Sequence, residues 1–261
     1  MVYSNPFYNF LVYSKPFYNF AKKTASMGRA FEFRKARKFA RWDKMAKTFT
    51  RIGKEIEMSV KDGGPNPDAN ARLRALIQNA RSENMPKEVI DRAIKRAISK
   101  YTTDYKEKLY EGFGPYGIAI LVETATDNST RTVANIRTCF NKYNGSFGTQ
   151  GAVEFMFDHK CHFKIKNIDL NVEELEFEMI DFGAEEVFED EDCIMIYGDF
   201  SSFGSLQKAI EDKGIEITSS GFDRIPQTTK ELNEEQQIEI NKLLDKIEED
   251  DDVLTVYHNI A

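Results

Sequence analysis

The apolar positions near the start of the chain predict a helical region. Between residues 31 and 60 they recur every three or four residues, the spacing of one helix face: Phe39, Trp42, Met45, Ala46, Phe49, Ile52, Gly53 and Ile56. The glycines and prolines of segment 62–67 cannot continue this helix. A second helix over 68–82 and a third beginning at Pro86 follow. Three short amphipathic helices predict a compact helical domain over residues 27–103.

Beyond a linker at 101–109, the pattern changes to strands that alternate with helices. We expect strands at 118–124, 152–157, 162–165, 185–188, 193–197, 216–219, 224–228 and 253–257, and helices at 129–143, 172–182, 202–213 and 233–247. The middle of this series has the order β-α-β-β-α-β, which is typical of a ferredoxin-like domain. The outer pieces are expected to pair into one sheet.

The predicted fold class is α+β, multidomain. An N-terminal three-helix domain is followed by two α+β domains, the second (ferredoxin-like) inserted in the first. The expected bounds are 27–103 for the helical domain, 104–158 plus 223–261 for the outer α+β domain, and 159–222 for the inserted one.

The first 26 residues follow a different pattern. Val2–Phe10 recurs almost unchanged as Val12–Phe20, a period that matches no known solenoid repeat. One interpretation is an aromatic docking tail. The interpretation we favour is that translation starts at Met27 and that the extension is a misassigned start. In either case we expect this segment to be disordered or loosely attached.

Charge divides the chain more sharply than its net charge of −7 suggests. Residues 22–108 contain 23 Lys+Arg against 11 Asp+Glu, whereas residues 109–261 contain 12 against 32. This asymmetry predicts a polyanion-binding segment joined to a part that repels polyanions. The chain has no apolar run near the ~18 residues of a membrane span, no secretory signal and three scattered cysteines. We therefore expect a cytoplasmic protein without a membrane partner.

The candidate nucleic-acid-binding residues are the cations of the helical region. Seven lie opposite the apolar face of the first helix: Arg34, Arg37, Arg41, Lys44, Lys47, Arg51 and Lys54. A second group follows on the next two helices: Arg72, Arg74, Arg81, Lys87, Arg92, Lys95 and Arg96. Each phosphate that such cations neutralise releases about one counterion, so binding to DNA or RNA would be strong and salt-sensitive. The competing interpretation is a solvated helix face.

Four strings give the chain a family resemblance. They are DGGPNPDANARLRALIQNARSENMPKEVIDRAIKRA (62–97), YEGFGPYGIAILVETATDNSTRTVANIR (110–137), GSFGTQGAVEFMF (145–157) and EEDDDVLTVYHNI (248–260). In these strings the chain closely resembles the YebC/PmpR family over residues 27–261. The resemblance implies three domains, one inserted in another, and nucleic acid as the partner. The family commonly begins with Gly-His-Ser-Lys-Trp, whereas this chain has Gly28-Arg29-Ala30-Phe31-Glu32-Phe33, so no contact of that segment is carried over.

Several other motifs have a structural and a functional interpretation. The glycines of segment 112–117 precede a strand instead of opening a helix, which favours a turn over a phosphate cradle. Segment 126–131 combines polar groups that fit a helix cap and an Asp127–Arg131 contact, or else surface recognition. The cluster His159, Cys161 and His162 lacks a fourth ligand, so we predict no zinc site. The five carboxylates of 248–252 are either solvated or competitors of nucleic acid for the basic domain.

The function that combines these observations is a nucleic-acid-binding regulator of gene expression, read as a DNA-binding transcriptional regulator. The alternative is a ribosome-associated translation factor that binds ribosomal or transfer RNA and relieves stalled translation. A homodimer would help a DNA-binding protein, because one short basic helix reads few base pairs. The sequence offers no catalytic constellation, so we predict no enzyme, no metal and no cofactor.

Overall fold

The computed structural model describes residues 45–99, 104–166, 170–190 and 192–261. Residues 49–261 form one compact unit, and residues 45–48 belong to the unit before it. The expected extension over residues 1–26 and the start of the first predicted helix lie outside the described residues. No helix among the described residues is long and apolar enough to cross a membrane.

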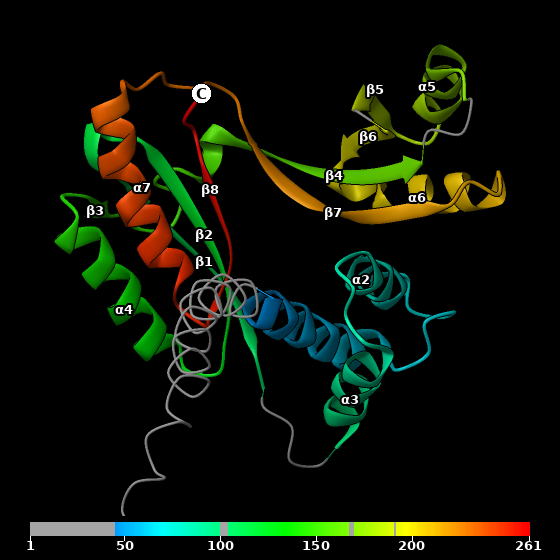
Figure 1. Cartoon of the computed structure of the whole chain (residues 1–261), viewed down its shortest axis with the longest axis horizontal. Helices are drawn as coiled ribbons and strands as arrows, with labels where there is room; N and C mark the ends of the chain where they lie inside the picture. The colour runs from blue at the N-terminus through cyan, green and yellow to red at the C-terminus, as the bar shows by residue number, and fades with distance from the viewer. Residues whose placement is uncertain (1–44, 100–103, 167–169, 191) are drawn as a thin grey trace, which may run out of the picture. The chain divides into compact units, whose positions relative to one another are not determined.

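The helical region consists of a helical segment over 45–63, α2 (Ala71–Ser82) and α3 (Lys87–Ile98) (Figure 1). Its core contains the apolar residues whose spacing predicts it, among them Ile52, Ile56, Val60, Leu73 and Ile90. The first helical segment ends where the sequence predicts, before a glycine with φ of 86°. The second helix begins at Ala71 instead of Asp68, because the Asn70 side chain accepts the N–H of Leu73 and caps it there.

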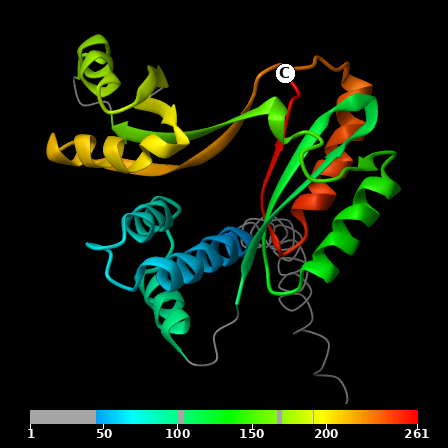
Figure 2. The ribbon, with the colours of Figure 1, turned by 180° about the vertical axis from the view of Figure 1, so that it is seen from behind.

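The first sheet has the strand order β3 (Ser146–Phe147), β1 (Lys106–Phe113), β2 (Ala119–Thr126), β8 (Val253–His258), and every neighbouring pair is antiparallel. Helices α4 (Ser129–Lys142) and α7 (Glu234–Glu248) cover one of its faces and lie next to each other (Figure 1 and Figure 2). The pairing of β2 with β8 confirms that both outer pieces of the chain contribute a strand to one sheet. The strand expected at 224–228 does not join this sheet, because residues 217–226 form one strand that pairs in the second sheet.

Strand β1 corrects the prediction of a linker over 101–109. The sequence of β1 does not alternate between buried and exposed positions, so the pattern does not predict a strand. Lysines occupy its start, and the adjacent residues Glu111 and Gly112 near its end are both buried. A Cβ atom at residue 112 would lie 2.6 Å from the ring of Phe140 on α4, so only glycine lets the helix pack this closely. The following turn is the short 3₁₀ helix η1 (Pro115–Gly117), in which Gly117 has the expected positive φ.

The predicted strand over 152–157 is wrong. Half of it is the 3₁₀ helix η2 (Glu154–Met156), and a strand begins only at Phe157. The reason is that a side chain accepts the backbone N–H groups that a neighbouring strand would need. Glu111 is buried, and its carboxylate accepts the backbone N–H groups of Gly151, Val153 and Glu154 at 2.6, 2.7 and 2.9 Å. Charge-assisted bonds of this kind are roughly twice as strong as neutral ones.

The second sheet has the order β5 (Ala184–Asp190), β6 (Cys193–Asp199), β4 (Phe157–Lys166), β7 (Ile217–Pro226). Helices α5 (Val172–Ile180) and α6 (Phe203–Asp212) pack their apolar residues on one face, and the short η3 (Phe200–Ser202) precedes α6. In chain order these elements are β-α-β-β-α-β, which confirms the predicted ferredoxin-like series. Where the domains divide stays a prediction.

Strand β7 is continuous, although the sequence suggests two strands on either side of Gly221. The glycine faces His162 of β4, and a Cβ atom there would lie 3.1 Å from the imidazole ring. It therefore makes room for a neighbour instead of interrupting the strand. The outer edge of β7 is capped by Asn79 of α2, whose amide donates to Ser220 O at 2.5 Å and accepts Ser220 N–H at 2.9 Å. This pairing satisfies backbone groups of an edge strand.

Candidate nucleic-acid interface

Of the seven cations predicted on the first helix, four lie outside the described residues: Arg34, Arg37, Arg41 and Lys44. Lys47 is half-buried. Arg51 is half-buried too, and its guanidinium donates to Glu248 O at 2.8 Å. Neither residue is placed on a fully exposed basic face.

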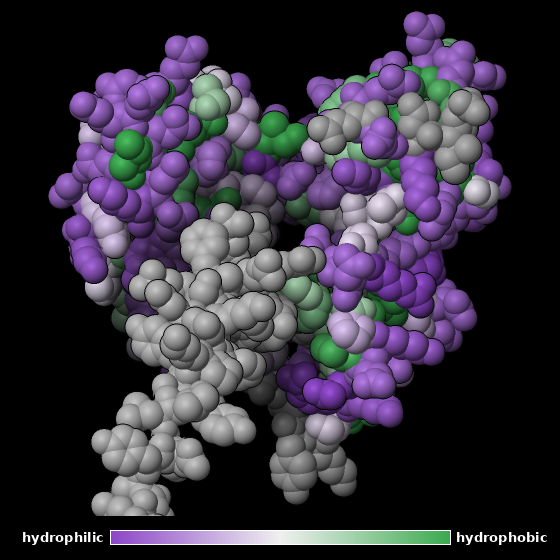
Figure 3. All heavy atoms as spheres, viewed as in Figure 1, coloured by the Kyte–Doolittle hydropathy of each residue, from purple (hydrophilic) through white to green (hydrophobic). Residues whose placement is uncertain are grey.

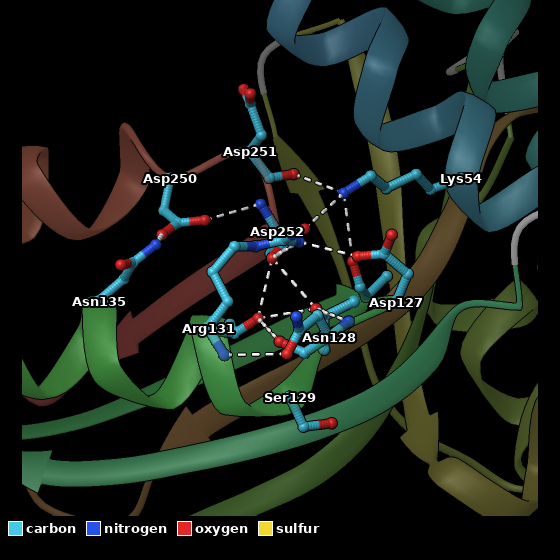
Figure 4. A network of polar contacts seen from close by, with 12 residues as sticks. Lys54, Asp127, Asn128, Ser129, Arg131, Asn135, Asp250, Asp251 and Asp252 are labelled. Carbon is cyan, nitrogen blue, oxygen red and sulfur yellow. Dashed lines mark hydrogen bonds and ion pairs between the residues drawn. The ribbon is translucent and has the colours of Figure 1, made fainter.

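Lys54 is not on an exposed face, and the prediction that placed it there is wrong. It is only 8% exposed. Its ammonium donates to Asp251 O at 2.7 Å and Ala125 O at 3.2 Å, and lies 3.2 Å from an Asp252 carboxylate oxygen (Figure 4). All three N–H groups thus have acceptors, which is what burial of an ammonium requires. Helical spacing alone cannot reveal this, since the partners lie far away in the sequence.

Asp252 is the centre of this buried network (Figure 4). Its second carboxylate oxygen accepts hydrogen bonds from Arg131 at 2.6 Å, Thr132 at 2.8 Å and Thr126 at 3.1 Å. Burial by itself raises the pKa of Asp252, but the donors from Arg131, Thr132 and Lys54 outweigh it, so the pKa is lowered. The carboxylate is therefore held ionised. The network joins the first helical segment to β2, α4 and the start of β8.

Segment 126–131 supplies the other half of this network. Asn128 caps α4 by accepting the N–H of Arg131 at 3.1 Å, and Arg131 contacts Asp127 at 2.8 Å. Both contacts are those that the sequence predicts. Because the guanidinium of Arg131 is also engaged by Asp252, these contacts give the motif a structural role.

The acidic run 248–252 is only partly solvated. Asp252 is buried, and Asp250 accepts a hydrogen bond from Asn135 at 2.9 Å. The run meets the first helical segment directly, through the buried Lys54–Asp252 pair and the bond from Arg51 to Glu248 O. Whether the run competes with nucleic acid stays a hypothesis.

Three predicted cations of α2 and α3 are engaged by carboxylates. Arg72 contacts Glu107 at 2.5 Å, and Arg74 contacts Glu211 at 3.1 Å. Arg96 lies 3.1 Å from Glu57, whose side chain is almost fully buried. Removing any of these three would leave an acid without its partner, so they also have structural roles.

Three of the remaining predicted cations form what we call the α3 cation face: Lys87, Arg92 and Lys95. All three are exposed, and no ion pair with any carboxylate in the described parts of the chain engages them. Arg81, at the end of α2, has the same character. On a helix, Lys87, Arg92 and Lys95 project away from the buried Ile90, Ala93 and Ala97. The atoms over this region are mostly hydrophilic (Figure 3).

The side chains of the cluster His159, Cys161 and His162 make packing and polar contacts within the second sheet and its neighbours. His159 stacks on Phe200 with ring centroids 4.0 Å apart, and Cys161 is buried in the core of the second sheet. His162 lies 2.9 Å from Asp223. Among the described residues, no group of three or more His, Cys, Asp or Glu side chains is arranged to hold a metal ion.

Comparison with known proteins matches almost the whole chain beyond its extension. The TACO1/YebC protein N-terminal domain matches residues 29–100, and the TACO1/YebC second and third domain matches residues 105–260. A crystal structure of a conserved hypothetical protein from Aquifex aeolicus has a TM-score of 0.71 at 34% identity and covers 83% of this chain and 90% of that one. It has the same mixed fold, which confirms the fold class.

Two similar relatives come from bacteria of the genus Flavobacterium. A probable transcriptional regulatory protein of Flavobacterium johnsoniae is 67% identical over 234 residues, which is 90% of this chain and 99% of that protein. Its counterpart in Flavobacterium psychrophilum is 65% identical with the same coverage. A protein of Parabacteroides distasonis with the same description is 60% identical over 235 residues, or 90% of this chain and 97% of its own. The chain therefore belongs to the TACO1/YebC family, as the four sequence strings predict.

Proposed function

We propose that this protein is a cytoplasmic, non-enzymatic transcriptional regulator that binds duplex DNA with its helical region. Relatives that are 60–67% identical carry the description of probable transcriptional regulatory proteins. These names favour transcription over the ribosome-associated alternative. The structure separates the candidate cations that are exposed from those that carboxylates engage, and so reduces the number of candidate phosphate-binding residues.

The observation that carries the proposal is the α3 cation face. The chain contains 43 acidic residues, and they engage Lys54, Arg72, Arg74 and Arg96. Lys87, Arg92 and Lys95 stay exposed and without such a partner in the described residues. Exposed cations on one helix suit phosphate groups, whose neutralisation drives binding through counterion release. Phosphate contacts position a protein on DNA without reading its sequence, so specificity must come from other contacts.

The test is a titration of mixed-sequence duplex DNA at several salt concentrations, followed by fluorescence anisotropy. Replacing both Arg92 and Lys95 by glutamine removes two phosphate contacts, so the slope of log affinity against log salt should fall by about 2. The matched control replaces Lys208 and Lys242, exposed cations on α6 and α7, by glutamine and should keep the wild-type slope. An unchanged slope in the α3 variant would overturn the assignment. A parallel titration with single-stranded and duplex RNA identifies the preferred nucleic acid.

A further inference from the structure

A strongly acidic surface lies on the second sheet and its helix α5. Residues 167–207 contain 13 Asp+Glu and not one Lys or Arg. Some of these acids are paired with cations from outside that range, as Glu178 is with Lys213 and Glu185 with Lys160. Others, including Glu173, Glu174 and Asp181, have no ion-pair partner among the described residues. A surface of this charge repels nucleic acid, so its partner must be cationic.

Two large apolar side chains of α5 are exposed among these carboxylates. Phe177 is 79% exposed and Ile180 is 53% exposed, while Leu175 and Met179 of the same helix are buried in the core. Glu173, Phe177 and Ile180 are spaced four and three residues apart and therefore share one side of the helix. We call this side, with the flanking Glu174 and Asp181, the α5 face. Exposed aromatic side chains ringed by charge are typical of a protein-binding surface.

The last two turns of α3 carry the complementary pattern. Arg92, Lys95 and Arg96 lie there, and residues 92–98 include no acid. Ile98, next to these cations, is 61% exposed. One chain thus presents both an acidic helix face with an apolar centre and a basic helix face with an exposed apolar side chain.

We propose that the α5 face of one copy of this chain binds the last two turns of α3 of a second copy. Phe177 and Ile180 would cover Ile98, while Glu173, Glu174 and Asp181 face Arg92 and Lys95. Two short helices bury less surface than a standard stable interface, so the association is weak and falls with salt. This proposal does not depend on nucleic-acid binding. Because the two partners share cations, DNA and the second copy compete for α3 wherever both bind.

The test uses the full chain and two charge-reversed variants. One replaces Arg92 and Lys95 by glutamate, and the other replaces Glu173 and Glu174 by lysine. Sedimentation equilibrium from about 10 μM to about 1 mM at low salt gives the mean mass. The wild type should associate, and each variant alone should stay monomeric because both of its helix faces carry like charge. An equimolar mixture of the two variants should associate again, since each face then meets its opposite.

Two controls separate specific contact from general charge and folding effects. Replacing Glu234 and Glu235 by lysine makes the same charge change, likewise in the first turn of a helix, and this α7 variant should associate like the wild type. Replacing Phe177 by serine removes the apolar centre without changing the charge and should weaken association about tenfold. A wild type that stays monomeric across the range would overturn the proposal, as would a mixture of reversed variants that does not associate. Loss of DNA binding in the α5 variant alone would instead count against the proposed function.

Discussion

Lys54 and Asp252 lie 198 residues apart in sequence and form a buried ion pair with additional hydrogen bonds on both sides. A buried charge is stable only while its partners are in place, so removing one partner costs more than the pair contributes. Neither residue stands out in the sequence: one lies in a basic stripe and the other in an acidic run. The sequence predicts the charges of both residues but cannot show that they meet.

We expect Asp252→Asn to lower the free energy of unfolding by about 3–5 kcal/mol, because it leaves Lys54 buried with carbonyl acceptors only. Urea unfolding measures this change. The control is Lys246→Met, which breaks an exposed pair with Glu249 and should cost under about 1 kcal/mol. Equal effects of the two substitutions would mean that the Asp252 network contributes nothing beyond a surface pair.

Glu55, on the first helical segment, makes stability depend on pH. The pKa of its carboxyl is raised from the ordinary 4.5 to about 7, mainly by burial. In that net value Arg72 and Arg51 lower the pKa, whereas the carboxylates of Glu107 and Glu123 raise it. The folded state therefore holds a proton that the unfolded state releases. The stabilising contribution of Glu55 is fully present below about pH 4.5 and is lost as the pH rises through 7.

We expect the contribution of Glu55 to lower the free energy of unfolding by up to roughly 3 kcal/mol between about pH 5 and pH 7. Other titrating groups add their own changes to this one. Glu55→Gln should flatten this decline and be more stable than the wild type at pH 8, because it needs no proton to stay neutral. Urea unfolding at a series of pH values provides the comparison. Parallel pH profiles of the two proteins would contradict the role of Glu55.

At the scale of elements, the sequence predicts helices better than strands. Helices α4 and α7 are found within one residue of the expected bounds, since their apolar spacing and capping residues are local. The predictions of a linker over 101–109 and of a strand over 152–157 are wrong for the same reason. Glu111 looks like a solvent-facing residue of a polar stretch, yet it is buried and binds three N–H groups about 40 residues away.

This explanation predicts that Glu111→Gln releases the segment 151–154. An amide has a single acceptor oxygen, and its NH₂ group would face N–H donors, so at least one buried donor loses its partner at a cost of about 1–3 kcal/mol. Hydrogen exchange of the Gly151, Val153 and Glu154 amides should accelerate. Glu154→Gln, which changes a half-buried acid of the same segment, serves as the control. Unchanged exchange in the Glu111 variant would show that another contact holds the segment.

At the scale of the whole molecule, the charge asymmetry predicts that nucleic acid binds the helical region, but it does not show which cations of that region are exposed. Four of the ten candidate cations in the described residues are engaged by carboxylates of other segments: Lys54, Arg72, Arg74 and Arg96. What the sequence cannot show is which cations remain free after folding. On α3, Lys87, Arg92 and Lys95 are exposed and have no ion-pair partner within the described parts of the chain, and the proposed function assigns phosphate binding to them.

The most direct test of that function is ultraviolet crosslinking in cells, followed by purification of the protein and sequencing of the attached DNA and RNA. Wild type and the Arg92→Gln/Lys95→Gln variant are compared at equal abundance. We expect wild-type crosslinks to be enriched at a limited set of promoter segments and to be largely lost in the variant. Crosslinks concentrated on ribosomal or transfer RNA, or a variant with the wild-type pattern, would contradict DNA binding through α3.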